Sequence, residues 1–167
     1  RILNATMLIP ENAAKMYMQI GLFEGEGIYY LDAVWVSEGA APTKFNYIQN
    51  PSFYWYDKID PPRDWTYPQR SSVSSEKDGT DCVLRFKGDP DIAVTAYQDY
   101  AVNGKAGDVL VFGANSKADC SASGNDGHRF YGIRMHLKDK NQNIIQTKAV
   151  QFNKEVSGTW QSLLGSI

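Results

Sequence analysis

Aromatic side chains are the residues of this sequence whose type best suits ligand chemistry. The chain holds 4 Trp, 10 Tyr and 7 Phe, and these aromatics make up 13% of its residues. Aromatic rings stack on the apolar C–H faces of sugars, while nearby amides and carboxylates bind the hydroxyls. The sugar-binding candidates are Trp35, Tyr54, Tyr56, Tyr67, Tyr97 and Tyr131. Each of them has an alternative role as a core residue, which is the commoner place for a large aromatic side chain.

Residues suited to catalysis are sparse. His128 and His136 are isolated, and the sequence has no HExxH, GxSxG, P-loop or GxGxxG motif. A glycosidase needs two carboxylates roughly 5–10 Å apart in a cleft. Carboxylate pairs such as Asp57/Asp60 lie in loop-like segments and are typical of solvated turns. We therefore expect a protein that is not an enzyme.

The two cysteines give no metal signature. Cys82 and Cys120 have 37 residues between them and no CxxC or histidine spacing that would indicate zinc. They could form one disulfide that ties the loop at 116–127 to a strand. We favour two free thiols, with Cys82 in the core, because a chain of this length needs no covalent staple.

Chain length and net charge exclude several further classes of protein. A chain of 167 residues predicts one domain, and 43% apolar residues are enough for a packed core. The net charge of −2, without a basic cluster, argues against a nucleic-acid partner. The longest apolar runs have four residues, so we expect no insertion into a membrane. Because the sequence opens with Arg1, we expect a piece of a longer protein.

Short strands and turns dominate the pattern. The segment 15–23 alternates with period two, with its methionines on one face, and therefore predicts a strand. Alternation in 28–36 places Asp32 on the same face as Val34 and Val36. Segment 37–46 is a polar connector, and 60–75 is loop-like. The predicted strands are 2–8, 15–23, 28–36, 53–56, 82–86, 92–102, 108–114, 129–137 and 144–152. About ten short strands without a helix predict an all-β antiparallel sandwich or barrel.

Several motifs resemble one family of β-sandwich modules. Asn50-Pro51-Ser52-Phe53 precedes Trp65-Thr66, and a Gly-Lys-x-Gly-Asp turn follows at 104–108. Phe-Asn at 152–153, Trp-Gln at 160–161 and the aromatic-x-Asp-x-Val strand at 30–34 complete the set. Together these motifs resemble the tandem jelly-roll modules, galactose-binding-like and related to carbohydrate-binding modules, of large bacterial surface proteins that carry RHS repeats or cell-wall domains.

The resemblance implies a permuted order of strands. The closing strand of such a module, here 30–36, precedes the opening segment at 50–53. We therefore expect one jelly-roll domain over 1–167, with closing strands in 1–36, a connector at 37–46 and opening and central strands in 47–167. The closing strands would dock onto the rest of the same chain. The alternative is donation of 1–36 to a neighbouring molecule, as in a swapped dimer or a filament.

The resemblance also implies a calcium site. These modules often hold a structural Ca²⁺ with an Asp of the closing strand and an acidic residue just after the opening Phe. Asp32 fits the first position, but Tyr54 occupies the second, so that Asp57, Asp78 or backbone carbonyls around Phe53 could substitute. The alternative is that Asp32 accepts hydrogen bonds from backbone amides. The resemblance further implies that Trp65 and Trp160 are buried.

Taken together, the sequence predicts a noncatalytic, extracellular or cell-surface bacterial module of a tandem array. Its partners would be a polysaccharide or glycan and the neighbouring repeat modules. The alternative is a structural spacer that self-associates by strand exchange, and a jelly-roll enzyme such as a lyase is a further reading. The binding hypothesis predicts two or three exposed aromatics on one concave face, whereas the spacer hypothesis predicts that they are buried.

Overall fold

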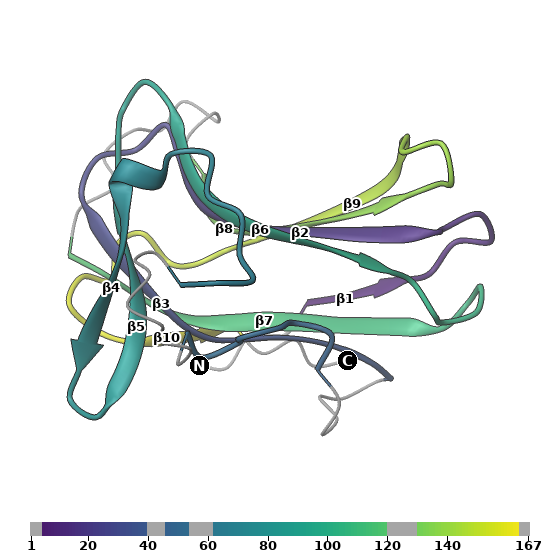
Figure 1. Ribbon diagram of the computed structural model, residues 1–167, viewed down its shortest axis with the longest axis horizontal. Coiled ribbons are helices and arrows are strands. Elements are labelled where there is room, and N and C mark those ends of the chain that lie inside the picture. Colours follow the sequence, from purple (N-terminus) through teal and green to yellow (C-terminus); the bar gives the residue numbers. More distant parts are fainter. Residues whose placement is uncertain (1–4, 40–45, 54–61, 120–129, 164–167) are drawn as a thin grey trace.

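Two antiparallel β-sheets pack face to face in the computed structural model, which describes residues 5–39, 46–53, 62–119 and 130–163 (Figure 1). Sheet A has the order β1-β7-β3-β5-β4, with β10 also paired to β7, and sheet B has the order β6-β2-β8-β9. The predicted all-β sandwich is confirmed. The strands are β1 (Ala5–Leu8), β2 (Lys15–Phe23), β3 (Ile28–Glu38), β4 (Val73–Asp78), β5 (Asp81–Lys87), β6 (Ala93–Ala101), β7 (Val109–Ala118), β8 (Phe130–Lys138), β9 (Ile144–Gln151) and β10 (Gln161–Leu163).

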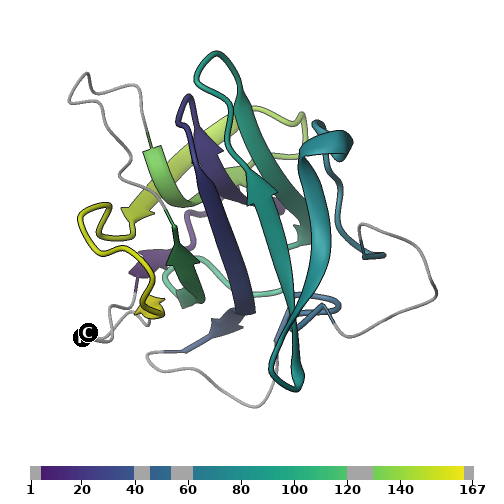
Figure 2. The same ribbon diagram turned by 90° about the vertical axis from the view of Figure 1, so that its left-hand side faces the viewer.

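The second and third strands of the chain lie inside the two sheets. β2 is flanked by β6 and β8, and β3 is flanked by β7 and, over its first half, β5. Figure 2 shows β3, β5 and β4 side by side. Beyond the connector the chain returns along the second half of β3, where Tyr47 N–H donates to Val36 O at 2.8 Å and Val34 N–H donates to Pro51 O at 2.9 Å. The strands within the first 38 residues thus pair with segments far along the same chain.

Sequence alternation predicted most strands, but it missed β4. Val73 is the only apolar residue of this strand, whose sequence is VSSEKD. β4 is the edge strand of sheet A and pairs only with β5, so its later residues meet solvent and carry no apolar signal. The prediction of a loop over 60–75 was therefore wrong for the start of β4. The predicted strand at 53–56 lies outside the described residues beyond Phe53.

A β-bulge corrects the predicted faces of β3. The register with β7 shifts between Asp32 and Trp35, and Ala33 takes a φ of 48° there. The extra residue reverses the alternation. Leu31 and Val34 are therefore both buried, whereas Asp32 is half-exposed. The prediction that Asp32 shares a face with Val34 was wrong, and the Asp32 side chain lies on the side of sheet A that faces away from sheet B.

The two sheets are joined through a buried tyrosine as well as by apolar packing. Tyr29 of β3 stacks on Phe86, with ring centroids 4.4 Å apart. Its hydroxyl crosses to sheet B, accepts a hydrogen bond from Leu22 N–H at 2.8 Å and donates one to Val94 O at 2.7 Å. Leu22 and Val94 are opposite each other in the β2–β6 ladder. The hydroxyl therefore sits between two backbone groups of the facing sheet.

One edge of β7 is shared by the first and last described strands. Ala5 of β1 is opposite Phe112, and Leu163 of β10 is opposite Ala114. Both strands are antiparallel to β7, so they run in the same direction, end to end. The edge of sheet A that lies opposite β4 thus consists of two short strands taken from opposite ends of the described chain.

Candidate functional site

The predicted sugar-binding aromatics do not converge on one surface. Tyr131 is buried, and its hydroxyl is hydrogen-bonded to the Ser116 hydroxyl. Trp35 is half-buried, and Tyr67 packs against the core and donates its hydroxyl proton to Pro62 O at 3.1 Å. Tyr97 lies on the outward-facing side of sheet B and is partly exposed. Tyr54 and Tyr56 lie outside the described residues.

Tyr97 belongs to an aromatic cluster that sequence reasoning missed. Its ring centroid is 4.8 Å from that of Tyr17 on β2, and the Tyr17 ring is 5.7 Å from that of His136 on β8. Tyr17 is opposite both Asp99 of β6 and His136 in the sheet register. The signal was present in segment 15–23, because the same alternation that buries its methionines points Tyr17 to solvent. We refer to this side of sheet B as the outer face.

Polar groups surround the cluster on the outer face. The Gln19 amide donates to the Thr95 hydroxyl at 3.2 Å, and His136 Nδ1 is 2.8 Å from the Thr147 hydroxyl. Burial and the neighbouring charges of Arg134 and Lys138 lower the pKa of His136. The imidazole is therefore neutral at neutral pH and can both donate and accept a hydrogen bond.

Burial is also the main cause that raises the pKa of Tyr17 to about 12, with Tyr97 and Asp99 adding to it. The Tyr17 hydroxyl therefore keeps its proton at neutral pH. Ring faces, an amide, hydroxyls and a neutral imidazole thus lie together on one surface.

Two glycines allow the outer face to be concave. Gly21 and Gly132 are opposite each other in the β2–β8 register. A Cβ at Gly21 would lie 2.3 Å from Val94 O, and one at Gly132 would lie 2.1 Å from Val150 O. Neighbouring backbones can come this close only at glycine. In Figure 1 strands β6, β2 and β8 of sheet B curve upward at the left, with the outer face inside the curve.

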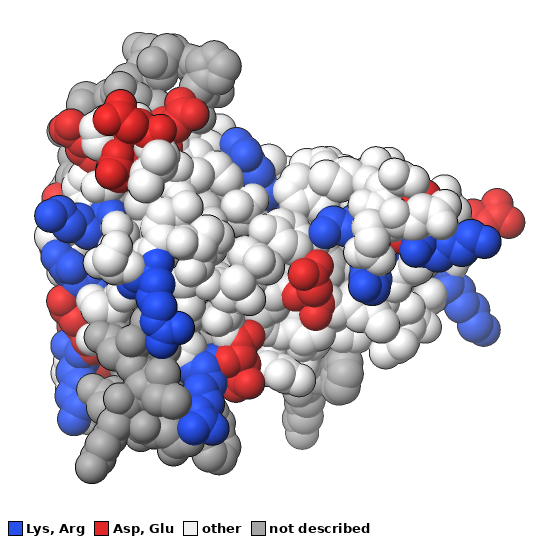
Figure 3. Space-filling view, turned by 45° about the horizontal axis from the view of Figure 1, so that its top comes forward, with Lys and Arg blue, Asp and Glu red and all other residues white. Residues whose placement is uncertain are grey.

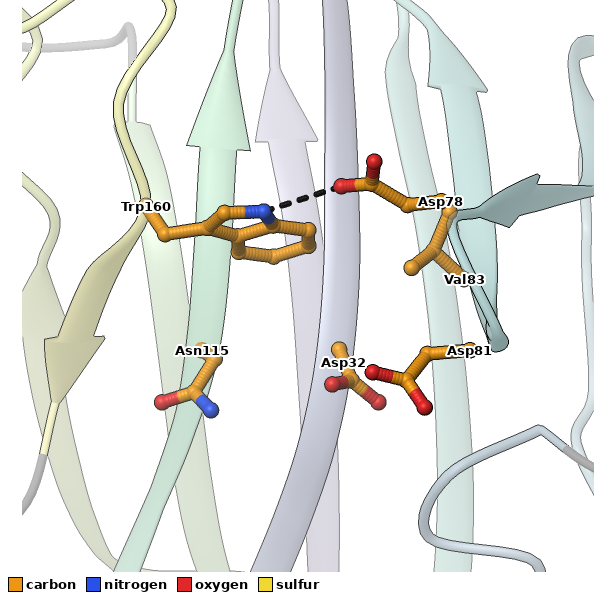
Figure 4. Close-up of a pocket in the computed structure, with 6 residues that line it drawn as sticks. All are labelled: Asp32, Asp78, Asp81, Val83, Asn115 and Trp160. Carbon is orange, nitrogen blue, oxygen red and sulfur yellow. Dashed lines mark hydrogen bonds between the residues drawn. The ribbon is translucent and has the colours of Figure 1, made fainter.

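A second candidate surface is a pocket of about 200 Å³ on the outer side of sheet A. Its lining comes from five segments of the chain and contains three carboxylates, an amide, an indole and one apolar side chain. Figure 4 shows the side chains of Asp32, Asp81 and Asn115 projecting on the side of the pocket opposite the bond between Trp160 and Asp78. The lining residues are Asp32, Asp78, Asp81, Val83, Asn115 and Trp160.

Trp160 is the exposed tryptophan of this pocket, not the buried residue that the sequence predicted. Its side chain is 36% exposed, whereas Trp65 is buried as expected. The indole N–H donates to Asp78 Oδ2 at 3.0 Å, and Lys117 Nζ lies 3.1 Å from the same oxygen. These two hydrogen bonds lower the pKa of Asp78. Lys117 Nζ also lies over the Trp160 ring, 5.2 Å from its centroid. Asp78 and Trp160 are therefore held by contacts within the protein.

Asp32 is the carboxylate of the pocket whose charge is least favoured. Burial is the main cause that raises its pKa, and the negative charges of Asp81 and Asp78 add to the rise. The Ala33 N–H donates to Asp32 Oδ1 at 2.7 Å and opposes the rise. The structure thus brings together Asp32 and Asp78 of the calcium prediction, while Asp57 lies outside the described residues. Within the described part of the chain no three His, Cys, Asp or Glu side chains form a group that could hold a metal ion. A calcium site stays a prediction.

Replacing Asp32 by asparagine should stabilise the protein at neutral pH. The raised pKa means that the folded chain binds this proton more tightly than the unfolded chain. The contribution of this tighter proton binding to the free energy of unfolding is therefore fully present below the ordinary pKa of 3.8. It is lost as pH rises through the raised pKa of the folded protein. Asp32→Asn should raise the free energy of unfolding at about pH 7 by less than about 1 kcal/mol, because the group is half-exposed.

Urea unfolding in a chelating buffer at about pH 7 and about pH 3 measures this effect, which should vanish at the lower pH. Asp91→Asn, in the exposed turn before β6, is the matched control. Lower stability of Asp32→Asn than of the wild-type protein in the chelating buffer at about pH 7 would contradict an unfavourable Asp32 charge. A second set of unfolding curves, with Ca²⁺ in place of the chelator, tests calcium. Stabilisation by Ca²⁺ that Asp32→Asn abolishes would support the calcium prediction.

No family model, no curated protein and no solved structure matched the chain. Cys82 is buried and free. No helix in the described ranges has the length and apolarity needed to cross a membrane.

Proposed function

We propose that this chain is a noncatalytic carbohydrate-binding module and that the outer face of sheet B binds the glycan. The Tyr17–Tyr97 pair carries the proposal, because both rings are partly exposed on a concave sheet face. Aromatic rings of this kind stack on the C–H faces of sugars. Gln19, His136 and Thr147 lie beside them and supply donors and acceptors for sugar hydroxyls.

The proposal includes a cellular setting taken from the sequence motifs. The chain would be a jelly-roll module in permuted order within a tandem array of a bacterial extracellular or cell-surface protein. Neighbouring modules of the array would be its other partners. Exposure of the aromatic pair favours the binding module over a structural spacer, because a spacer has no need to keep two tyrosine rings in contact with water.

The aromatic pair provides a direct test of glycan binding. A double variant, Tyr17→Ala with Tyr97→Ala, should weaken binding by about 10- to 100-fold, because it removes the stacking surface but keeps the strands. A glycan array covering plant, mucin and bacterial polysaccharides would identify ligands for the wild-type protein. Isothermal titration with the best array ligand would then compare the variants.

Tyr30→Ala is the matched control, because Tyr30 is a partly exposed tyrosine on the other sheet, and it should keep wild-type affinity. Thermal unfolding should confirm that all the variants fold. No binding by the wild-type protein across the array would favour the spacer. A fall in polysaccharide viscosity on incubation would overturn the noncatalytic assignment.

A further inference from the structure

The outer face carries an excess of positive charge in a chain whose overall charge is negative. The outward-facing positions of its strands hold Lys15, Arg134 and Lys138, against the single carboxylate of Asp99. With His136 neutral, this face has a net charge of +2, whereas the whole chain has −2. In Figure 3 blue side chains lie on both halves of the surface, red gathers at the upper left, and further red side chains lie among the blue ones towards the right.

Arg134 is held in place by aromatic rings and not by a carboxylate. Its guanidinium carbon lies 3.9 Å from the ring centroid of Phe23 and 4.5 Å from that of Phe130. Phe23 and Phe130 are opposite each other two register positions beyond the glycine pair, so the Arg134 side chain passes over Gly21 and Gly132. No ion pair joins Arg134 to a carboxylate among the described residues. Its planar donors remain available to an external anion.

Lys138 and Lys15 extend the positive surface beside the tyrosine pair. The two lysines are directly opposite each other in the β2–β8 register. Like charges at opposite positions destabilise a sheet unless an anion compensates them. Lys138 Nζ lies 4.4 Å from the centroid of the Tyr17 ring, and its carboxylate neighbour Asp99 is 3.7 Å away. A long ion pair whose carboxylate is exposed to water is weak.

We infer that the glycan bound by the outer face is an acidic polysaccharide, whose carboxylate or sulfate groups pair with Arg134, Lys138 and Lys15. This inference rests on the proposed function, because it assigns the ligand class of the same surface. Arg134 and Lys138 are four residues apart on β8, about 13 Å along a strand. The basic groups thus flank the tyrosine rings along the strand direction. A chain with anionic groups on successive sugars would meet both kinds of contact at once.

Pairs of related polysaccharides, one charged and one neutral, separate the effect of charge on binding from the effect of sugar identity. The probes are polygalacturonate and its methyl ester, carboxymethyl cellulose and hydroxyethyl cellulose, and dextran sulfate and dextran, with duplex DNA as a polyanion without a pyranose backbone. In affinity electrophoresis the wild-type protein should be retarded by at least one carboxylated or sulfated polymer and less by its neutral partner. Raising the salt from about 0.05 M to about 0.5 M should weaken the retardation.

Two charge variants should reduce this retardation. Arg134→Gln should weaken the affinity for the acidic polymer about tenfold, because it removes one charge-assisted contact. Because Arg134 also packs on two rings, the double variant Lys15→Gln with Lys138→Gln provides a second test and should have a similar effect. Lys77→Gln, on the edge strand β4 of the other sheet, should leave affinity unchanged.

The outcomes distinguish this inference from the proposed function. Equal retardation by acidic and neutral partners, or retardation that both charge variants leave intact, would overturn the inference and leave glycan binding in place. Retardation by duplex DNA as strong as by the best polysaccharide would overturn it in favour of general polyanion binding. No retardation by any probe, together with no binding on the glycan array, would overturn the proposed function itself.

Discussion

A Gly132→Val variant should fail to reach the native fold or should lose more than about 3 kcal/mol of stability. A Cβ at this position would lie 2.1 Å from Val150 O and 2.9 Å from Gln151 Cα. Both atoms belong to the backbone of the neighbouring strand β9, so no side-chain rotation can relieve the overlap. The sheet would have to straighten, and the concave outer face would be lost with it.

Circular dichroism and urea unfolding of the purified variant measure this effect. Ala149→Val is the matched control, because Ala149 is exposed on β9 close to the same site. A valine suits an exposed strand position, so the control should change stability by less than about 0.5 kcal/mol. Wild-type stability of Gly132→Val would show that the close approach of β8 and β9 is not a property of the folded protein.

A Tyr29→Phe variant should lose about 2–4 kcal/mol of stability, although it removes a single oxygen atom. The lost hydroxyl leaves Leu22 N–H without its acceptor and Val94 O without its donor. Tyr29 is 1% exposed, so water cannot take the place of the hydroxyl at no cost. The expected loss exceeds that of an ordinary hydrogen bond, because two backbone groups of sheet B depend on one atom from sheet A.

Urea unfolding with a linear extrapolation compares the variants. Tyr100→Phe is the control, because the Tyr100 hydroxyl accepts from Gln49 N–H at 2.9 Å and the Gln98 side chain also accepts from that N–H at 3.1 Å. We expect a change below about 1 kcal/mol for Tyr100→Phe. A loss of the same size from both variants would mean that the position between the sheets gives Tyr29 no special role.

Period-two alternation was sufficient to predict the strands that have one buried face. It predicted β2 with its observed bounds, because Met16, Met18 and Ile20 alternate with residues that face solvent. It did not predict the reversal at Ala33, because a bulge depends on the register with a partner strand and leaves no periodic signal. The error moved Asp32 to the wrong face.

The pocket of sheet A could be predicted only in part. Asp32 and Asp78 were named together for a calcium site, from a resemblance, but Asp81 and Asn115 were not singled out and Trp160 was expected to be buried. These residues meet because β4, β5, β3 and β7 are neighbours in the sheet, an order that differs from their order in the chain. Local spacing carries no information about such an order. Cross-strand neighbours such as Tyr17 and Tyr97 escape sequence reasoning for the same reason.

The shared edge of β7 determines how the module would respond to tension. Ala5 and Leu163 lie next to each other, opposite Phe112 and Ala114, and the two strands extend from this point in opposite directions. A force that separates these residues loads the hydrogen bonds of β1 and β10 one after another, starting at the pulled ends. Strands loaded in this way unzip, and only a few interstrand hydrogen bonds break at a time. Strands that are sheared along their length must break many interstrand hydrogen bonds together. Under load the protein would therefore release β1 and β10 before the rest of the sandwich yields.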